Sequence, residues 1–278
     1  MTVTTLYDGE IRREVTEDYI RNASLEDLQT SLEEAFLPTT HFNNPYTFTA
    51  VEIDGRHILI DAGTGDLLAP SIDDGARAMA AAGLDPNAVE LVVLTHFHPD
   101  HVGGIADADG RPTFPNAVVL FPEVEYAFIH NDQAVSALPA TMQDFAAAAR
   151  AKLSAYGDAL RLFADGEILA PGIRASASPG HTPGHMSVVL ESEGEILIVV
   201  GDAITYPALF VPNPGWHVVF DADGPRAEAT RRDLLRRAQT SCARVIGTHF
   251  PFPSIGRIFV RNGRFAYVPE QWTNALGG

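Results

Sequence analysis

Residues 89–104 read VELVVLTHFHPDHVGG, an apolar run that ends in a segment crowded with metal-ligand side chains. The run VELVVLT is typical of a buried strand because it is apolar at nearly every position. The next six residues, 96–101, contain three histidines and one aspartate, and Gly103 and Gly104 then allow a tight turn. Four such groups beside a buried strand would crowd protons and charge unless a cation organised them. This segment therefore predicts a metal site at the end of a strand.

The spacing within this segment is suited to two metals rather than one. His96 and His98, one residue apart on an extended or turning segment, can face the same side. After the bend that Pro99 stiffens, Asp100 and His101 can face a second point nearby. We therefore expect one loop to contribute ligands to two neighbouring cations.

Three later stretches repeat the pattern of an abrupt strand end followed by a ligand-type side chain. The loop SPGHTPGH, residues 178–185, carries His181 and His185. Asp202 follows the apolar run ILIVV, and His249 follows the run ARVI. Asp202 can bridge two cations, because each carboxylate oxygen can bind a different one. Taken singly, a turn aspartate or a lone histidine is most often an ordinary hydrogen-bonded residue. The interpretation of these positions as metal ligands therefore depends on the histidine-rich segment.

The rest of the chain mixes apolar runs with helical periodicity and predicts a mixed α/β domain. A hairpin is expected over residues 46–61, where Asp54-Gly55 suits a two-residue turn. Helices are expected at 72–82, 123–130, 140–156 and 225–238. Further strands are expected at 89–95, 117–121, 173–176, 186–191, 196–200, 244–247, 257–261 and 264–268. The arginines of the last helix are interpreted as a face exposed to solvent: Arg231, Arg232, Arg236 and Arg237.

The domain organisation is interpreted as one domain over residues 41–278, because no repeat, low-complexity tract or linker interrupts it. Residues 1–40 are the least determined part of the chain. The run EDLQTSLEEAF favours a helix, and the segment is interpreted as an arm or helix that covers the site, contacts a second copy or belongs to the same domain. On this basis we expect a homodimer. The first residues hold no basic stretch followed by an apolar run, so the expected location is cytoplasmic.

Composition excludes several function classes. The 278 residues are 46% hydrophobic and 20% charged, which is a globular rather than a disordered profile. The formal net charge of −17 repels phosphate backbones and anionic bilayers, so neither nucleic acid nor a membrane is an expected partner. The single cysteine, Cys242, leaves histidines and carboxylates as the ligands for any metal.

The motif HFHPDH, followed by His181, Asp202 and His249, resembles in order and approximate spacing the metal-binding residues of the metallo-β-lactamase superfamily. The resemblance covers roughly residues 40 to 268. It implies an α/β (α+β) fold, namely an αββα sandwich with the site at one edge between two sheets. It also implies two metal groups bridged by Asp202, one held by His96, His98 and His181 and the other by Asp100, His101 and His249.

The same resemblance implies roles for residues around the ligands. Asp61, in IDAGTG, matches the acidic residue that supports the ligands from behind, and His185 is expected to support its own loop. Asp100 is a candidate proton shuttle. Tyr206 is a candidate hydrogen-bond donor to a substrate oxygen, although lactonases of the superfamily carry a tyrosine one position earlier, where this chain has Thr205. The alternative for Tyr206 is a half-buried aromatic residue at a strand edge.

Histidine and aspartate ligation favours two divalent metal ions, with Zn²⁺ ahead of cobalt, manganese, nickel or iron. Two such ions can hold a hydroxide between them as a nucleophile, so a dinuclear metal-dependent hydrolase is expected. Three alternatives stay open: a thioester hydrolase resembling glyoxalase II, a β-lactam hydrolase, and a non-catalytic metal-binding protein of the same fold. Redox relatives carry an acidic residue in place of His98, and nuclease branches fit poorly with the charge of −17.

The C-terminal third is similar to the branch that contains methyl parathion hydrolase and related aryl-ester and lactone hydrolases. The similarity lies in residues 217–238 and in THFPFPSIGRI, residues 248–258. It implies a small-molecule lactone or aryl carboxylic ester as substrate, with promiscuous phosphotriesterase activity as a side reaction. Seven aromatic residues, each also compatible with the core, are candidates to line the substrate pocket: Phe42, Tyr126, Phe128, Phe210, Trp216, Phe250 and Phe252.

Overall fold

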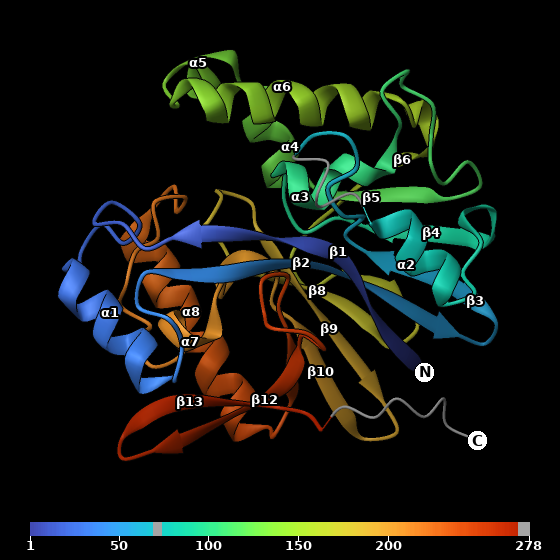
Figure 1. Ribbon diagram of the computed structural model, residues 1–278. Helices are drawn as coiled ribbons and strands as arrows, with labels where there is room; N and C mark the ends of the chain where they lie inside the picture. The colour runs from blue at the N-terminus through green and yellow to red at the C-terminus, as the bar shows by residue number, and fades with distance from the viewer. Residues whose placement is uncertain (69–73, 272–278) are drawn as a thin grey trace.

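The computed structural model describes residues 1–68 and 74–271, and its strands form two sheets that lie face to face. Figure 1 shows helices on the outer sides of this pair, so the layers follow the order helix, sheet, sheet, helix. The arrangement confirms the predicted αββα sandwich and the mixed α/β class. In the described residues, no helix is both long enough and apolar enough to cross a membrane.

The first sheet is built from the N-terminal part of the chain. In spatial order its strands are β1 (Thr2–Glu14), β2 (His41–Ile53), β3 (Arg56–Ile60), β4 (Val89–Val93), β5 (Val118–Pro122) and β6 (Leu160–Phe163). The pairs β1–β2 and β2–β3 are antiparallel, whereas β3 to β6 run parallel. Because parallel strands end at the same edge of a sheet, the loops that follow β3, β4 and β5 gather there.

The second sheet is mostly antiparallel. Its strands are β7 (Ile168–Ala170), β8 (Ile173–Ala177), β9 (Met186–Ser192), β10 (Glu195–Val199), β11 (Arg244–Ile246), β12 (Ile255–Arg261) and β13 (Arg264–Pro269), in spatial order from β13 back to β7. The pair β10–β11 is the parallel exception, so these two strands also end at a common edge.

Helices bury the outer face of each sheet. The first sheet is covered by α2 (Gly75–Ala81), α4 (Glu123–Ile129), α5 (Asp132–Ser136) and α6 (Ala140–Ser154), which share one apolar cluster with it. The second sheet is covered by α1 (Leu25–Glu34), α7 (Pro207–Phe210) and α8 (Gly224–Thr240) through a second cluster. One short helix, α3 (Pro99–Val102), lies in the loop after β4.

Strand β3 shows how the sequence sets these layers. Ile58 and Ile60 belong to the apolar cluster between the two sheets, whereas Leu59 belongs to the cluster beneath the helices. Successive side chains of a strand point to opposite faces, so a strand that is apolar at every position must be covered on both sides. Val92 and Val93 of β4 divide in the same way, which confirms the buried strand predicted before the histidine-rich segment.

Residues 1–40 contribute to both halves of the sandwich. Strand β1 pairs with β2 along nearly its whole length, a strand that was not predicted from the sequence. Helix α1 lies in the predicted helical run and begins after Ser24, whose side chain and backbone form a reciprocal capping box with Asp27. Leu28 and Leu32 of this helix are buried in the cluster of the second sheet.

The remaining predicted elements are present with shifts at their ends. The hairpin over 46–61 is formed by β2 and β3, although β2 begins at His41. The helix predicted at 72–82 is α2, which begins at Gly75, and positions 72 and 73 lie outside the described residues. The short elements β6, β7, α5 and α7 were not predicted, because each spans only one or two turns or a few strand residues.

Candidate dinuclear metal centre

Strand ends from both sheets place the candidate ligands at one edge of the sandwich. His181 lies in the loop between β8 and β9, Asp202 follows β10, and His249 follows β11. The loop after β4 carries His96, His98, Asp100 and His101, the last two on α3. All seven predicted ligands therefore converge, although up to 153 positions separate them in the sequence, 249 − 96 = 153.

Two glycines allow the histidine-rich loop to pack tightly against the turn after β3. A Cβ atom added to Gly103 would lie 1.9 Å from the carbonyl oxygen of Thr64. One added to Gly104 would lie 2.0 Å from the carbonyl oxygen of Ala62. Only glycine fits at such approaches, so these two residues position the segment that carries the ligands.

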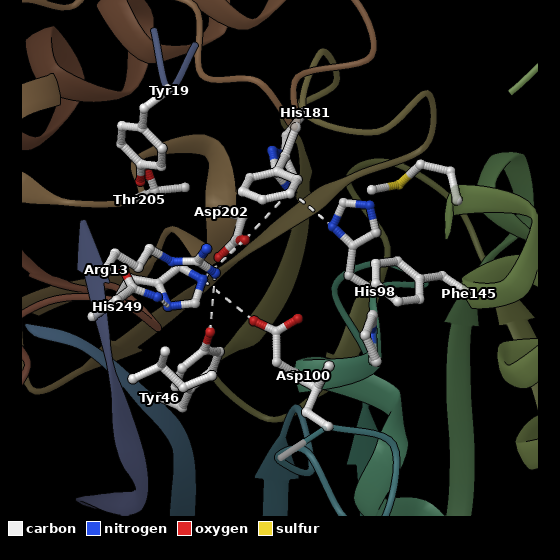
Figure 2. Close-up of a pocket in the computed structure, with 16 residues that line it drawn as sticks. Arg13, Tyr19, Tyr46, His98, Asp100, Phe145, His181, Asp202, Thr205 and His249 are labelled. Atoms are coloured by element: carbon white, nitrogen blue, oxygen red, sulfur yellow. Dashed lines mark hydrogen bonds and ion pairs between the residues drawn. The ribbon is translucent and has the colours of Figure 1, made fainter. Parts of the chain in front are cut away.

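The ligands form two groups that share Asp202. One group is His96, His98, His181 and Asp202, and the other is Asp100, His101, Asp202 and His249. In each group, one ligand atom per residue lies within 4.8 Å of all the others. The side chains are buried, and even that of Asp100 is only 11% exposed. Figure 2 shows His249, Asp202 and Asp100 pointing toward one another, with His98 and His181 beside them.

Unpartnered polar atoms show that the groups suit cations. His96 Nε2, His101 Nε2 and Asp202 Oδ1 are buried without a hydrogen-bond partner in the described residues. His101 Nε2 lies 3.4 Å from Asp100 Oδ2 and from Asp202 Oδ1, but without the alignment of a hydrogen bond. Buried polar groups are normally satisfied, so these atoms fit the nitrogen and oxygen ligands of divalent metal ions.

Outer partners fix which ring nitrogen of His101 and of His249 faces the cluster. His101 Nδ1 lies 2.7 Å from Asp61 Oδ2, and the backbone N–H of Thr95 donates to the other carboxylate oxygen of Asp61 at 2.8 Å. His249 Nδ1 lies 2.8 Å from the carbonyl oxygen of Pro45, which accepts its proton. Each contact engages Nδ1 and leaves Nε2 free to bind a metal. The geometry therefore suits the supporting role expected of Asp61.

His181 is held by a buried ion pair that was missed in the sequence. Its Nδ1 lies 3.1 Å from Asp221 Oδ1, and Arg231 Nη2 lies 3.3 Å from Asp221 Oδ2. Arg231 is fully buried and also donates to the backbone carbonyls of Ala203, Pro214 and Trp216. The prediction of a solvated face is therefore wrong for Arg231, because its position on α8 turns inward, although Arg232 beside it is exposed.

His185 belongs to neither ligand group. Its Nδ1 lies 2.8 Å from Ser178 Oγ, and its Nε2 accepts the backbone N–H of Asp202 at 3.0 Å. Gly201 has a φ of +52°, and a Cβ there would lie 2.7 Å from the same His185 Nε2. The imidazole thus supports the turn that presents Asp202.

The electrostatics of the site follow from burial and close packing. Burial and the neighbouring His181 lower the pKa of His98 to about 3. Burial opposes protonation of His181, but Asp202 and Asp221 raise its pKa to about 9. Burial raises the pKa of Asp100, but His101 and other neighbours outweigh it and hold that pKa well below its usual value. This shift favours the ionised carboxylate, the form that can bind a metal.

Glu125 is a second supporting residue that was not predicted. It is fully buried at the start of α4, and its carboxylate accepts the backbone N–H groups of Phe97 at 3.2 Å and of Gly184 at 2.7 Å. It therefore joins the two histidine-bearing loops. Burial raises the pKa of Glu125 to about 7, and hydrogen bonds from Thr182, Gly184 and Phe97 only partly oppose this rise. Nothing in the residues that open α4 indicates that Glu125 joins these two loops.

A cavity opens above the ligands. Besides His98, Asp100, His181, Asp202 and His249, it is lined by Ile11, Arg13, Tyr19, Asn44, Tyr46, Leu68, Pro99, Met142, Phe145, Thr205 and Phe220. Most of this wall is apolar or aromatic, with a few polar groups on one side, as in small-molecule sites. Residues of β1 and β2 form part of it, so the first 40 residues take part in building the cavity.

The structure places most of the predicted aromatic wall away from the cavity above the ligands. Phe42, Phe210 and Phe250 are buried core residues, because each packs in the cluster beneath the second sheet. Trp216 packs against that same cluster and Tyr126 stacks on a neighbouring histidine ring. Phe252 lines a separate hollow. Phe128 lines a second cavity that shares His98, Met142, His181 and Phe220 with the one above the ligands.

Tyr206 also lies away from the cavity above the ligands. Its ring packs on Phe42 with centroids 4.6 Å apart, and it lines the separate hollow that includes Phe252 rather than the cavity above the ligands. Thr205 lines that cavity instead, because the chain turns into α7 at Tyr206. The tyrosines that line it are Tyr19 and Tyr46.

Fold and site together define an αββα protein with two adjoining His/Asp groups at one edge, the architecture of a binuclear metalloprotein. The family model of the metallo-beta-lactamase superfamily matches residues 44–249, well over half of the chain. The chain therefore belongs to the metallo-beta-lactamase superfamily.

Individual relatives are lactonases, nucleases and other hydrolases. The chain is 32% identical over 142 residues to the N-acyl homoserine lactonase AttM of Azorhizobium caulinodans, covering 48% of this chain and 49% of the relative. It is 31% identical over 199 residues to ribonuclease TTHA0252 of Thermus thermophilus, covering 68% and 43%. The chain thus spans about half the length of the curated relatives it matches. The solved structure of AidC, a dizinc quorum-quenching lactonase in complex with a product, has a TM-score of 0.90 and 26% identity over 98% of this chain and 95% of that chain.

Proposed function

We propose that this protein is a dinuclear metal-dependent hydrolase of lactones or aryl carboxylic esters. The observation that carries the proposal is the pair of ligand groups sharing Asp202 at the floor of a largely apolar cavity. Support comes from the N-acyl homoserine lactonase relative and from the lactonase structure with a product bound. The ribonuclease relative points to a different substrate, but a net charge of −17 opposes the approach of a polyanion.

Two cations would fit the ligand groups, and Zn²⁺ is the expected metal. Bound there, they would lower the pKa of water toward neutrality and polarise a carbonyl oxygen. His96, His98 and His181 would hold one cation, and Asp100, His101 and His249 the other, with Asp202 serving both. The outer contacts of Asp61, Asp221 and the Pro45 carbonyl orient three of these imidazoles before any metal binds.

The protein's own residues supply orientation and proton transfer. Asp100 lines the cavity beside the two ligand groups, and it stays the candidate proton shuttle between the attacking water and the leaving oxygen. Tyr46 replaces Tyr206 as the candidate donor to a substrate oxygen, because its side chain lines the cavity beside His249, with ring centroids 5.0 Å apart. Phe145 and Phe220 line the apolar part, which would exclude water from the scissile bond.

A substrate panel tests the proposal. The purified protein, stripped with a chelator and reloaded with Zn²⁺, is incubated with dihydrocoumarin, N-acyl homoserine lactones, p-nitrophenyl esters, paraoxon, S-lactoylglutathione and nitrocefin. We expect the lactones and carboxylic esters to turn over fastest and paraoxon slowly. Asp202→Asn should abolish turnover, whereas the exposed Asp233→Asn should not.

Each other outcome of the panel replaces the proposal with a named alternative. Faster turnover of S-lactoylglutathione or nitrocefin would make the protein a thioester or β-lactam hydrolase. Two bound metals without turnover of any substrate would make it a non-catalytic metal-binding protein. Turnover that survives metal stripping would exclude the dinuclear mechanism.

A homodimer remains our proposal for the assembly. Support comes from Phe36, which lies just after α1 and whose side chain is 97% exposed. An apolar residue at a subunit contact is exposed in this way when the chain is taken alone. Light scattering of the full chain should give twice the mass of 29.9 kDa. Phe36→Ser should shift it toward the monomer, and a monomeric wild-type chain would refute the proposal.

A further inference from the structure

The polar side of the cavity is built by the N-terminal strand. Ile11 and Arg13, two positions apart on β1, face the same side of the strand, and both line the cavity. Asn44, opposite Ile11 in the strand register, and Tyr46 line it from β2. The strand pair therefore brings one cationic side chain, Arg13, into the wall of a cavity whose floor carries the candidate metal ligands.

Arg13 has few partners in this wall. Its Nη2 donates to the hydroxyl of Tyr46 at 3.2 Å, and its guanidinium lies 5.5 Å from the centroid of the Phe220 ring. Among the described residues, no carboxylate forms an ion pair with it. A guanidinium carries five N–H donors in a rigid fork, so one hydrogen bond leaves most of them open. Figure 2 shows the side chain reaching into the space beside Tyr46 and His249.

The chemistry of such a group defines what it can recognise. A partly buried guanidinium without a carboxylate gains most from a ligand that accepts hydrogen bonds, above all a planar carbonyl or carboxylate. Away from Arg13 the wall is apolar, with Met142 and Phe145, so the remainder of the ligand would be hydrocarbon. A substrate that spans both parts of the wall carries an acceptor group and an apolar group around its scissile bond.

We propose that Arg13 is a specificity-determining residue that binds a second carbonyl or carboxylate oxygen of the substrate, separate from the carbonyl that is hydrolysed. The proposal rests on the proposed hydrolase function, because it names the substrate class that the same site selects. That class is lactones or esters with an amide carbonyl or carboxylate a few bonds from the scissile bond. Plain alkyl lactones lack this oxygen and would not use Arg13.

Two substrates with the same five-membered ring test the assignment. N-hexanoyl homoserine lactone carries an amide carbonyl, whereas γ-octalactone carries only an alkyl chain. Arg13→Met should lower kcat/KM for the first about 10- to 100-fold, the effect expected when a charged donor to a carbonyl is lost. It should change kcat/KM for the second less than about 3-fold. Arg13→Lys, which keeps the charge but loses the fork, should fall between wild type and Arg13→Met.

The neighbouring Arg12 provides a matched control. It points to the other face of β1, its side chain is 60% exposed, and it pairs with Glu14. Arg12→Met should leave both substrates unchanged. An equal loss for both substrates in Arg13→Met, or no loss for either, would overturn the assignment.

A binding measurement separates this proposal from the proposed function. If the wild type hydrolyses neither lactone, the hydrolase proposal fails for this class, and calorimetry then tests Arg13 directly. The ring-opened products N-hexanoyl homoserine and 4-hydroxyoctanoate are titrated into wild type and Arg13→Met. Weaker binding of the first alone, by about 10-fold or more, supports the role of Arg13. Equal affinities of the two proteins for both products would refute it.

Discussion

Replacing Arg231 by methionine should destabilise the protein more than most substitutions in a helix. The change removes a buried guanidinium and leaves the carboxylate of Asp221 buried, with His181 and the backbone N–H of Val218 as its remaining partners in the described part of the chain. Removing one member of a buried ion pair costs about 3–5 kcal/mol, because the other charge remains without compensation. At about 2–4 °C per kcal/mol for a chain of this size, we expect the melting temperature to fall by roughly 6–20 °C.

The chain offers its own control for this prediction. Arg232 lies one position further along α8, is 46% exposed, and pairs with Glu228 at the surface. Arg232→Met should change the free energy of unfolding by less than about 0.5 kcal/mol. Differential scanning calorimetry of both variants, with the metal content held equal, measures the contrast.

A double variant separates charge from packing. Arg231→Met with Asp221→Asn removes both charges, and the asparagine oxygen can still accept the hydrogen bond from His181. If the unpaired carboxylate causes the loss, the double variant should regain part of the stability. A melting temperature for Arg231→Met within 2 °C or so of wild type, or a double variant less stable than Arg231→Met, would refute the reasoning.

Three further predictions concern the residues around the ligands. Asp61→Asn, which weakens the hold on His101, should lower metal affinity about 10- to 100-fold in a competitive chelator titration, and an unchanged affinity would contradict the supporting role. Burial raises the pKa of Glu125 from 4.5 to about 7, so the folded protein retains a proton that the unfolded chain loses; this contribution to stability is complete below pH 4.5 and is lost as pH rises through 7. Urea unfolding between pH 4.5 and 8 should therefore show a steeper decline for wild type than for Glu125→Gln, and parallel curves would exclude the effect. Tyr206→Phe should keep kcat/KM within about 2-fold of wild type and Tyr46→Phe should not, whereas a 10-fold loss in Tyr206→Phe would restore the original prediction.

The ligand groups were open to prediction because their information is local. His96 to His101 occupy six consecutive positions, and Asp202 and His249 each follow an apolar run that ends abruptly. A ligand at the end of a buried strand is placed by the strand itself, so a motif and a strand together locate the side chain. The layer order followed in the same way from runs such as VELVVLT.

The cavity wall could not be predicted, because it depends on how distant elements pack. Tyr19, Tyr46, Phe145 and Phe220 come from four separate segments, and nothing in any one segment marks the side chain that faces the ligands. Strand β1 was missed because exposed charged residues such as Glu10, Arg12 and Glu14 alternate along its second half, a pattern that resembles a solvated arm.

The burial of Arg231, in contrast, could have been predicted, because the helical periodicity of the sequence indicates it. The buried positions of α8 include Ala227, Arg231, Leu234, Leu235 and Ala238, which follow helical spacing. Arg231 therefore occupies the apolar stripe. Four arginines in one helix were treated alike, although the periodicity separates this one from the others.

The sharing of Asp202 between the two groups has a consequence for how the protein matures during translation. The group of His96, His98 and His181 is complete once Asp202 has been synthesised, but the other group waits for His249, 47 residues later. At about 5–20 residues per second, the ribosome needs roughly 2–10 s for that stretch. We expect a nascent chain arrested between these positions to capture one equivalent of zinc, and the released chain to capture two.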